Sequence, residues 1–143
     1  MTRPKRTVLV VEDAADDAAL IRVAFRKLGF SDLFQTVENV QEAIRYLSRE
    51  QAFADTRRYP TPDLVLLDHQ LPGDGGQIIK WIREQPRLRS LPIVVFSGSE
   101  DPRHKSHALQ LGANAYYLKP GSFQHFTETV RHIIEHWAFA DTP

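Results

Sequence analysis

The stretch Leu64-Val65-Leu66-Leu67-Asp68 is an unbroken apolar run that ends in a carboxylate. An apolar run with no polar alternation is typical of a strand that is covered on both faces of a parallel sheet. Three further apolar runs also end in a charged or hydroxyl residue: 7–11 before Glu12 and Asp13, 93–96 before Ser97, and 115–118 before Lys119. Because the carboxyl ends of parallel strands meet at one edge of a sheet, we expect these groups to converge.

Helical patterns separate the apolar runs. Between residues 14 and 28, apolar side chains recur every three or four residues, which is the period of one helix face. A fifth run, 33–37, is a shorter strand candidate, and 48–63 is expected to be a surface loop. Helix caps are predicted at Asn39, Asp101 and Ser122, and helix ends at Gly29 and Gly112. Strict alternation of five strands and five helices predicts an α/β fold with a parallel sheet covered on both faces.

The bulk composition excludes several classes of protein. The 143 residues suit one domain, which we expect to span 1–143 with a core of about 6–137 and an aromatic tail at 138–143. The 18 basic and 18 acidic residues leave no basic surplus, so no nucleic-acid partner is expected. No apolar run approaches the ~20 residues of a membrane span, and no secretory signal is evident, so we expect a cytoplasmic protein. The absence of cysteine excludes disulfides and thiolate metal sites.

The converging groups have a definite chemistry. Clustered carboxylates favour a hard cation such as Mg²⁺, and a carboxylate beside that ion can attack phosphorus. A lysine and a hydroxyl can then bind phosphoryl oxygens. Each residue alone has a plainer explanation: Glu12 and Asp13 could begin a helix, Asp68 and Ser97 could form turns, and Lys119 could be a solvated charge. Their joint position after four separate strands favours a shared site.

The motifs around these residues resemble those of response regulator receiver domains. The resemblance rests on four segments in order: Val10-Val11-Glu12-Asp13, Leu66-Leu67-Asp68 with Leu71-Pro72-Gly73, Val94-Val95-Phe96-Ser97-Gly98-Ser99, and Gly112-Ala113-Asn114-Ala115-Tyr116-Tyr117-Leu118-Lys119-Pro120. It covers about residues 6–137 and implies a flavodoxin-like fold with strand order 2-1-3-4-5.

The resemblance also implies a role for each site residue. Asp68 would accept a phosphoryl group from a histidine kinase, and Ser97 and Lys119 would hold the phosphoryl oxygens. Tyr116 would be the aromatic whose rotamer follows Ser97. Mg²⁺ would be bound by four residues, namely Asp13, Asp68, Glu12 through water, and Gln70 through its backbone carbonyl. Such a protein is not an enzyme in the usual sense, because it catalyses only its own phosphorylation and dephosphorylation.

The subfamily and the output are narrower expectations. The Glu-Asp pair, the 48–63 loop, the Asp101-Pro102 helix start and the aromatic tail resemble single-domain regulators paired with bacterial phytochrome kinases. With no effector domain expected after residue 143, output would be protein–protein interaction. Trp137 and Phe139 suggest a homodimer through the last helix, although Trp137 could equally fold back on its own domain.

Two other functions compete with a phosphorylation switch. A receiver fold could serve as a constitutive binding or dimerisation module without phosphorylation, although the complete set of Asp13, Asp68 and Lys119 argues against that alternative. An aspartyl-nucleophile phosphatase or phosphotransferase is the second. Haloacid-dehalogenase-like enzymes place an acidic residue two positions after the nucleophile, and that position here is Gln70.

Overall fold

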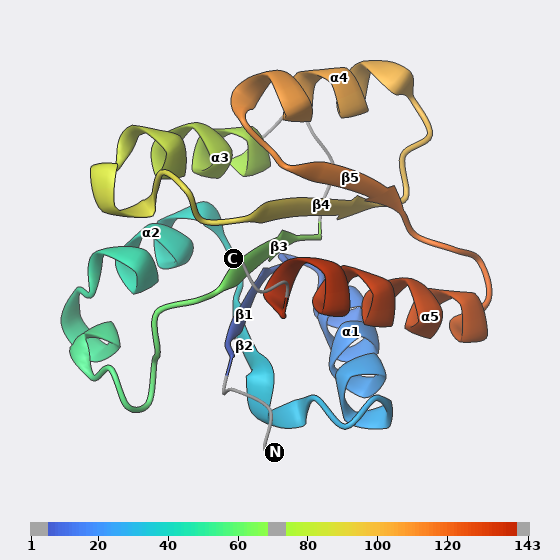
Figure 1. Ribbon diagram of the computed structural model, residues 1–143, viewed down its shortest axis with the longest axis horizontal. Helices are drawn as coiled ribbons and strands as arrows, with labels where there is room; N and C mark the ends of the chain where they lie inside the picture. Colours follow the sequence, from blue (N-terminus) through green and yellow to red (C-terminus); the bar gives the residue numbers. More distant parts are fainter. Residues whose placement is uncertain (1–5, 69–73, 140–143) are drawn as a thin grey trace.

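A computed structural model describes residues 6–68 and 74–139. Five parallel strands form one sheet in the order β2-β1-β3-β4-β5 (Figure 1). Their bounds are β1 Val8–Val11, β2 Phe34–Val37, β3 Leu64–Leu67, β4 Ile93–Ser97 and β5 Ala115–Leu118. The predicted fold class and strand order are confirmed.

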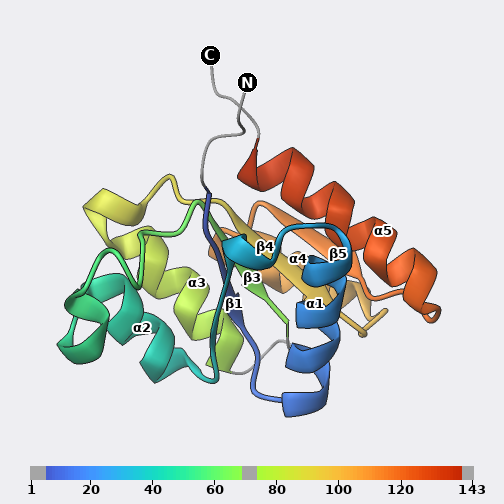
Figure 2. The same ribbon diagram turned by 90° about the horizontal axis from the view of Figure 1, so that it is seen from below.

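The helices form two layers around this sheet. Their bounds are α1 Ala15–Lys27, α2 Val40–Ser48, α3 Asp74–Glu84, α4 Pro102–Leu111 and α5 Phe123–Ile133. Helices α1 and α5 cover one face, and α2, α3 and α4 cover the other (Figures 1 and 2). Every residue of β1, β3 and β4 is buried, which explains why these strands have no polar alternation. Within the described part of the chain, no helix has the length and apolar character to cross a membrane.

The helix ends follow the predicted local signals. Asn39 accepts a hydrogen bond from the Glu42 amide at 2.8 Å, and Ser122 accepts one from the His125 amide at 3.2 Å. The Glu42 carboxylate accepts a hydrogen bond from the Glu38 amide at 2.7 Å. In a standard capping box the donor would be the amide of the cap residue, Asn39, which is one residue later. Gly112 ends α4 with a φ of 118°, a left-handed conformation that favours glycine.

The 48–63 segment is more ordered than a simple surface loop. It contains a short 3₁₀ helix, Gln51–Ala54, that places Phe53 against Tyr46 of α2, and Tyr59, further along the segment, packs against the same ring. The rings of these three residues lie 4.9–5.8 Å apart, and the Tyr46 hydroxyl donates to the Pro60 carbonyl at 2.7 Å. The polar composition of the segment therefore conceals a small aromatic cluster that holds it against α2.

Arg83 joins three parts of the fold near the amino ends of β4 and β5. Its guanidinium donates to the carbonyls of Gly112, Arg89 and Leu91 and to the Asn114 side chain, at 2.7–2.9 Å. A side chain on Gly112 would meet the Arg83 stem, so glycine is required there for space as well as for backbone conformation.

We predict that Arg83→Met lowers the free energy of unfolding by about 2–3 kcal/mol, because methionine keeps the apolar stem but leaves the oxygen acceptors without a donor. Urea denaturation measures the change. The exposed Arg89→Met is the matched control and should stay within about 0.5 kcal/mol of the parent. An equally small effect for Arg83→Met would show that the four hydrogen bonds contribute little.

Candidate functional site

The polar groups that follow the strands lie together, as the sequence predicts. A cavity of about 340 Å³ is lined by Glu12, Asp13, Ala14, Asp17, Asp68, Ser97, Gly98 and Lys119. The parallel register brings Val11 beside Leu67 and Leu67 beside Val95, so the residues after them emerge at one edge. The hydrogen bonds between β4 and β5 continue into the site, where the Lys119 amide donates to the Ser97 carbonyl at 2.8 Å.

Lys119 is the cation shared by the carboxylates of this cavity. Its ammonium is in direct contact with Asp68 Oδ1 and lies 3.3 Å from Asp17 Oδ2 and 3.9 Å from Glu12 Oε2. The Asp68 and Glu12 side chains are almost completely buried, whereas half of the Asp17 side chain is exposed. Three carboxylates thus face one ammonium, which leaves the site short of positive charge.

Burial dominates the acid–base properties of the site. Desolvation, and then the neighbouring Asp68 carboxyl, raise the pKa of Glu12 from 4.5 to about 9. Desolvation also raises the pKa of Asp68, although Glu12 and Lys119 partly oppose it. Burial alone would lower the pKa of Lys119, but its hydrogen bond and charge interaction with Asp68 raise it overall. At neutral pH, Glu12 therefore carries a proton and Lys119 stays charged.

The donor set fits a hard divalent cation. One oxygen each from Glu12, Asp17 and Asp68 lies within 4.8 Å of the others. Glu12 Oε2 and Asp68 Oδ2 are buried and make no hydrogen bond with the described residues, whereas Asp68 Oδ1 contacts the Lys119 ammonium. Buried oxygens without donors are costly unless a cation satisfies them, and an all-oxygen set suits Mg²⁺ or Mn²⁺.

Asp17 is the residue that the sequence analysis missed. It lies in the first turn of α1, whereas Asp13 precedes the Ala14 cap of that helix. Asp13 also lines the cavity but is exposed, and it is not among the three clustered carboxylates. Gln70, the other predicted ligand, lies outside the described residues.

The predicted switch residues are linked through one backbone segment. Ser97 is buried, and its Oγ accepts a hydrogen bond from the Ser99 amide at 3.1 Å. The Tyr116 hydroxyl donates to the Ser99 carbonyl at 2.9 Å. Ser97 therefore contacts the amide of Ser99, and Tyr116 contacts its carbonyl. Tyr116 also lines a cavity of about 370 Å³ between α4 and β5.

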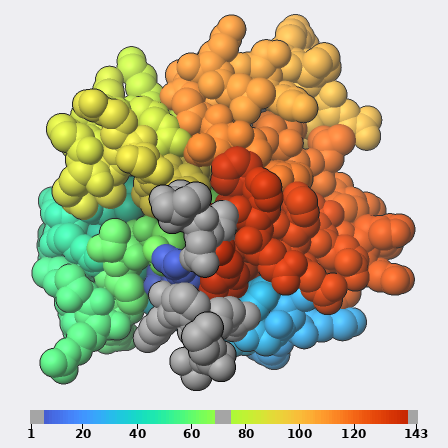
Figure 3. Space-filling model, viewed as in Figure 1, coloured from blue at the N-terminus to red at the C-terminus, as the bar shows by residue number. Residues whose placement is uncertain are grey.

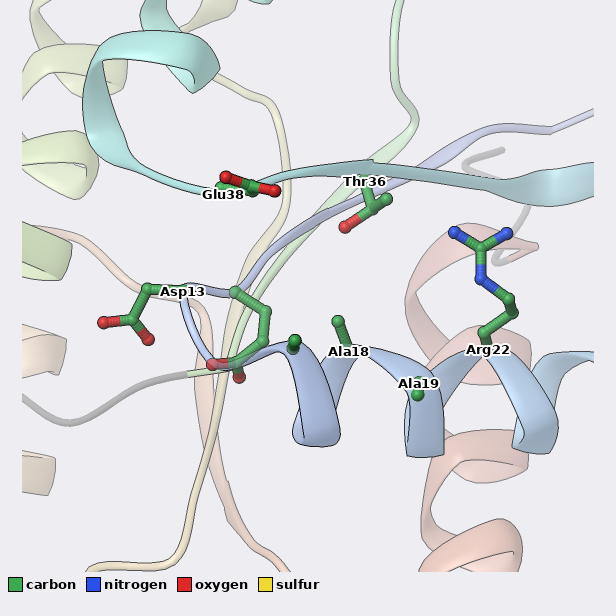
Figure 4. A pocket seen from close by; sticks show the side chains of 8 residues that line it. Asp13, Ala18, Ala19, Arg22, Thr36 and Glu38 are labelled. Carbon is green, nitrogen blue, oxygen red and sulfur yellow. The ribbon is translucent and has the colours of Figure 1, made fainter.

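A larger cavity, of about 480 Å³, lies beside the site between α1 and β2. Figure 4 shows Ala18, Ala19 and Arg22 of α1 along one side, Thr36 and Glu38 opposite them, and Asp13 at one end. Lys119, Ser97 and Asp68 do not line it. The groups that could bind and accept a phosphoryl group therefore belong to the smaller cavity.

The two predicted interface residues pack against their own chain. The Trp137 indole donates to the Tyr117 hydroxyl at 3.1 Å, and the rings of Phe139 and Phe30 lie 5.8 Å apart. Both side chains are only half-buried. Trp137 lies in a π-helical turn, Ile134–Ala138, that extends α5.

The comparison with known families decides the identity of this fold. The model of the response regulator receiver domain matches residues 8–131. The chain belongs to this family. The carboxylate cluster of Glu12, Asp17 and Asp68 lies within the matched residues.

Individual relatives support the same assignment. The chain is 34% identical to the probable methanogenesis regulatory protein FilR2 of Methanothrix harundinacea, over 91% of this chain and 82% of that protein. It is 28% identical to the phosphate regulon transcriptional regulatory protein PhoB of Escherichia coli over 90% of this chain, but spans only 52% of PhoB.

Two solved structures of response regulators are similar to this chain along almost their whole length. The phosphorylated cyanobacterial phytochrome response regulator RcpA is 31% identical, with a TM-score of 0.84 over 97% of this chain and 98% of RcpA. The Mn²⁺-bound form of response regulator Rcp1 is 25% identical, with a TM-score of 0.77 over 96% of this chain and 97% of Rcp1.

We predict that Glu12→Gln stabilises the metal-free protein more at about pH 8.5 than at about pH 5.5. The pKa of Glu12 is raised from 4.5 to about 9 in the folded protein, so folding favours the protonated carboxyl group. The stability that protonated Glu12 contributes is therefore complete below pH 4.5 and is lost as the pH rises through about 9. Glutamine is neutral throughout and removes this loss. Urea unfolding in the presence of a chelator measures the difference.

The exposed Glu50→Gln is the control and should show no such pH dependence. A constant difference between Glu12→Gln and the parent across this pH range would contradict the raised pKa.

Proposed function

We propose that this chain is a cytoplasmic two-component response regulator that accepts a phosphoryl group on Asp68 from a sensor histidine kinase. One observation carries the proposal: Asp68 is buried at the end of β3, the Lys119 ammonium contacts it, and the Ser97 hydroxyl lines the same cavity. A nucleophilic carboxylate beside a cation and a hydroxyl donor is suited to forming an acyl phosphate.

The proposed reaction is an in-line displacement at phosphorus. An Asp68 carboxylate oxygen forms the new bond to phosphorus while the bond from phosphorus to the kinase histidine nitrogen breaks, and that nitrogen keeps the electron pair. Lys119 shifts its ammonium from the Asp68 carboxylate toward the phosphoryl oxygens. Ser97 donates its hydroxyl proton to another of these oxygens, which stabilises the charge.

The site also favours a bound Mg²⁺, which when present supplies positive charge to offset the carboxylates and the incoming phosphoryl group. Glu12, Asp68 and the half-exposed Asp17 are the described groups that bring oxygens together for it. Asp13, at the rim of the cavity, and the Gln70 backbone carbonyl remain proposed ligands on the basis of family resemblance. The buried oxygens of Glu12 and Asp68 support this proposal.

The kinase and the output are proposed from the same comparisons. Because RcpA is a phytochrome response regulator and matches this chain almost end to end, we propose a kinase of the bacteriophytochrome type. Donation by the Ser97 hydroxyl to a phosphoryl group would alter its hydrogen bond with Ser99 and, through Ser99, the contact with Tyr116. The surface around α4 and β5 would then signal by protein–protein interaction.

We also propose a homodimer through α5 and the aromatic residues after it. Figure 3 shows α5, in red, at the surface between α1 and the α4–β5 segment. Trp137 and Phe139 contact their own chain but remain half-buried, so part of each ring is available to a second copy. Large aromatic side chains are enriched in such interfaces.

We predict that the parent, incubated with Mg²⁺ and acetyl phosphate, gains one phosphoryl group by intact mass spectrometry. Asp68→Asn should gain none, because an amide cannot act as the nucleophile. The exposed Asp55→Asn is the matched control and should behave as the parent. Full uptake by Asp68→Asn would refute the acceptor assignment, and no uptake by the folded parent would favour a constitutive binding module.

For the dimer, we predict that sedimentation velocity detects self-association that weakens in Trp137→Ala. The control is Trp81→Ala, which truncates the tryptophan of α3, on the opposite face of the sheet. A parent that sediments as a monomer at high micromolar concentration would rule the dimer out.

A further inference from the structure

Ser99 is the centre of a hydrogen-bond network at the start of the β4–α4 connection. Its amide donates to Ser97 Oγ at 3.1 Å, and its carbonyl accepts from the Tyr116 hydroxyl at 2.9 Å. Its own hydroxyl oxygen accepts from the Asp101 amide at 3.3 Å and lies 2.5 Å from His104 Nδ1. Ser99 is 9% exposed, so solvent replaces few of these contacts.

The contact with His104 comes from the first turn of α4. His104 is half-buried there, and Asp101 caps the same turn by accepting from the Arg103 amide at 2.9 Å. Because Ser99 Oγ already accepts from the Asp101 amide, its proton can be donated to His104. His104 Nδ1 accepts this proton in the tautomer that carries the ring hydrogen on Nε2.

The network determines where the Ser97 hydroxyl can point. The Ser99 amide occupies one lone pair of Ser97 Oγ, so the Ser97 proton must be donated in another direction. Ser97 lines the cavity that contains Asp68 and Lys119, so its hydroxyl can donate into that cavity. If the Ser99 segment were loose, the hydroxyl would lose this orientation, and preorganised donors stabilise developing charge best.

We propose that His104 is a positioning residue for the Ser97 hydroxyl and acts through Ser99, an inference that rests on the proposed phosphoryl transfer to Asp68. His104 lines neither the phosphoryl cavity nor the carboxylate cluster. Its contribution is to hold Ser99, whose amide holds Ser97. The same contacts connect the first turn of α4 to the phosphoryl site.

The test compares three variants of the full chain. His104→Leu removes the nitrogen acceptor, whereas His104→Asn places an amide oxygen near the position of Nδ1. His107→Leu is the matched control, because His107 is a half-buried histidine of the same helix. Each protein is assayed by NMR for hydrogen exchange of the Ser99 amide without metal, and for the initial rate of phosphoryl uptake from acetyl phosphate at saturating Mg²⁺.

His104→Leu should speed exchange of the Ser99 amide and slow phosphoryl uptake about three- to ten-fold, which corresponds to the loss of one hydrogen bond. His104→Asn should restore most of both values, and His107→Leu should match the parent. Should His104→Leu fail to fold, Ser99→Ala provides the second variant. It keeps the amide donor to Ser97 but loses the link to α4, and should show the same slower uptake.

Unchanged exchange of the Ser99 amide in folded His104→Leu would overturn the inference, whether or not the parent accepts phosphate. Faster exchange with an unchanged uptake rate in an active parent would overturn it as well. A parent that takes up no phosphate would instead refute the proposed function, while the exchange data would still decide whether His104 holds Ser99.

Discussion

The ammonium of Lys119, which lies against carboxylates from three other elements, is the interaction on which the site depends. It contacts Asp68 at the end of β3 and lies within 4 Å of Glu12 at the end of β1 and Asp17 in α1. Burying carboxylates is costly, and a single lysine offsets only part of that cost. The part of the burial cost that Lys119 does not offset raises the pKa of Glu12 and of Asp68. A site in this state gains stability from any cation that enters it.

The sheet is built to bring these groups together and hold them. Glu12 and Asp68 are the first residues after the buried strands β1 and β3, and Ser97 is the last residue of the buried strand β4. The parallel register of these strands brings the three residues to one edge of the sheet. Separate hydrophobic cores on the two faces anchor those strands, so the site rests on the most buried part of the molecule. The segment after β4 is different, because there Ser97 and Ser99 connect the site to α4 and to Tyr116 through side-chain hydrogen bonds.

Local signals account for what could be predicted from the sequence. Apolar runs identify buried strands, and the caps at Asn39 and Ser122 depend on contacts three residues away. The strand-end rule then places Asp68, Ser97 and Lys119 in one cavity. Asp17 was missed because an acidic residue in the first turn of a helix is also explained by the helix dipole. The contacts of Arg83, and the packing of Phe53 and Tyr59 on Tyr46, depend on residues brought together only by the fold.

The most direct test of this account is the number of protons released when Mg²⁺ binds. Isothermal titration calorimetry at neutral pH, repeated in buffers of different ionisation enthalpy, measures that number. Because the pKa of Glu12 is raised to about 9 in the metal-free protein, we expect the parent to release about one proton per Mg²⁺ bound. Glu12→Gln should release almost none. Mg²⁺ binding by the parent without proton release would contradict the charge deficit on which the account rests.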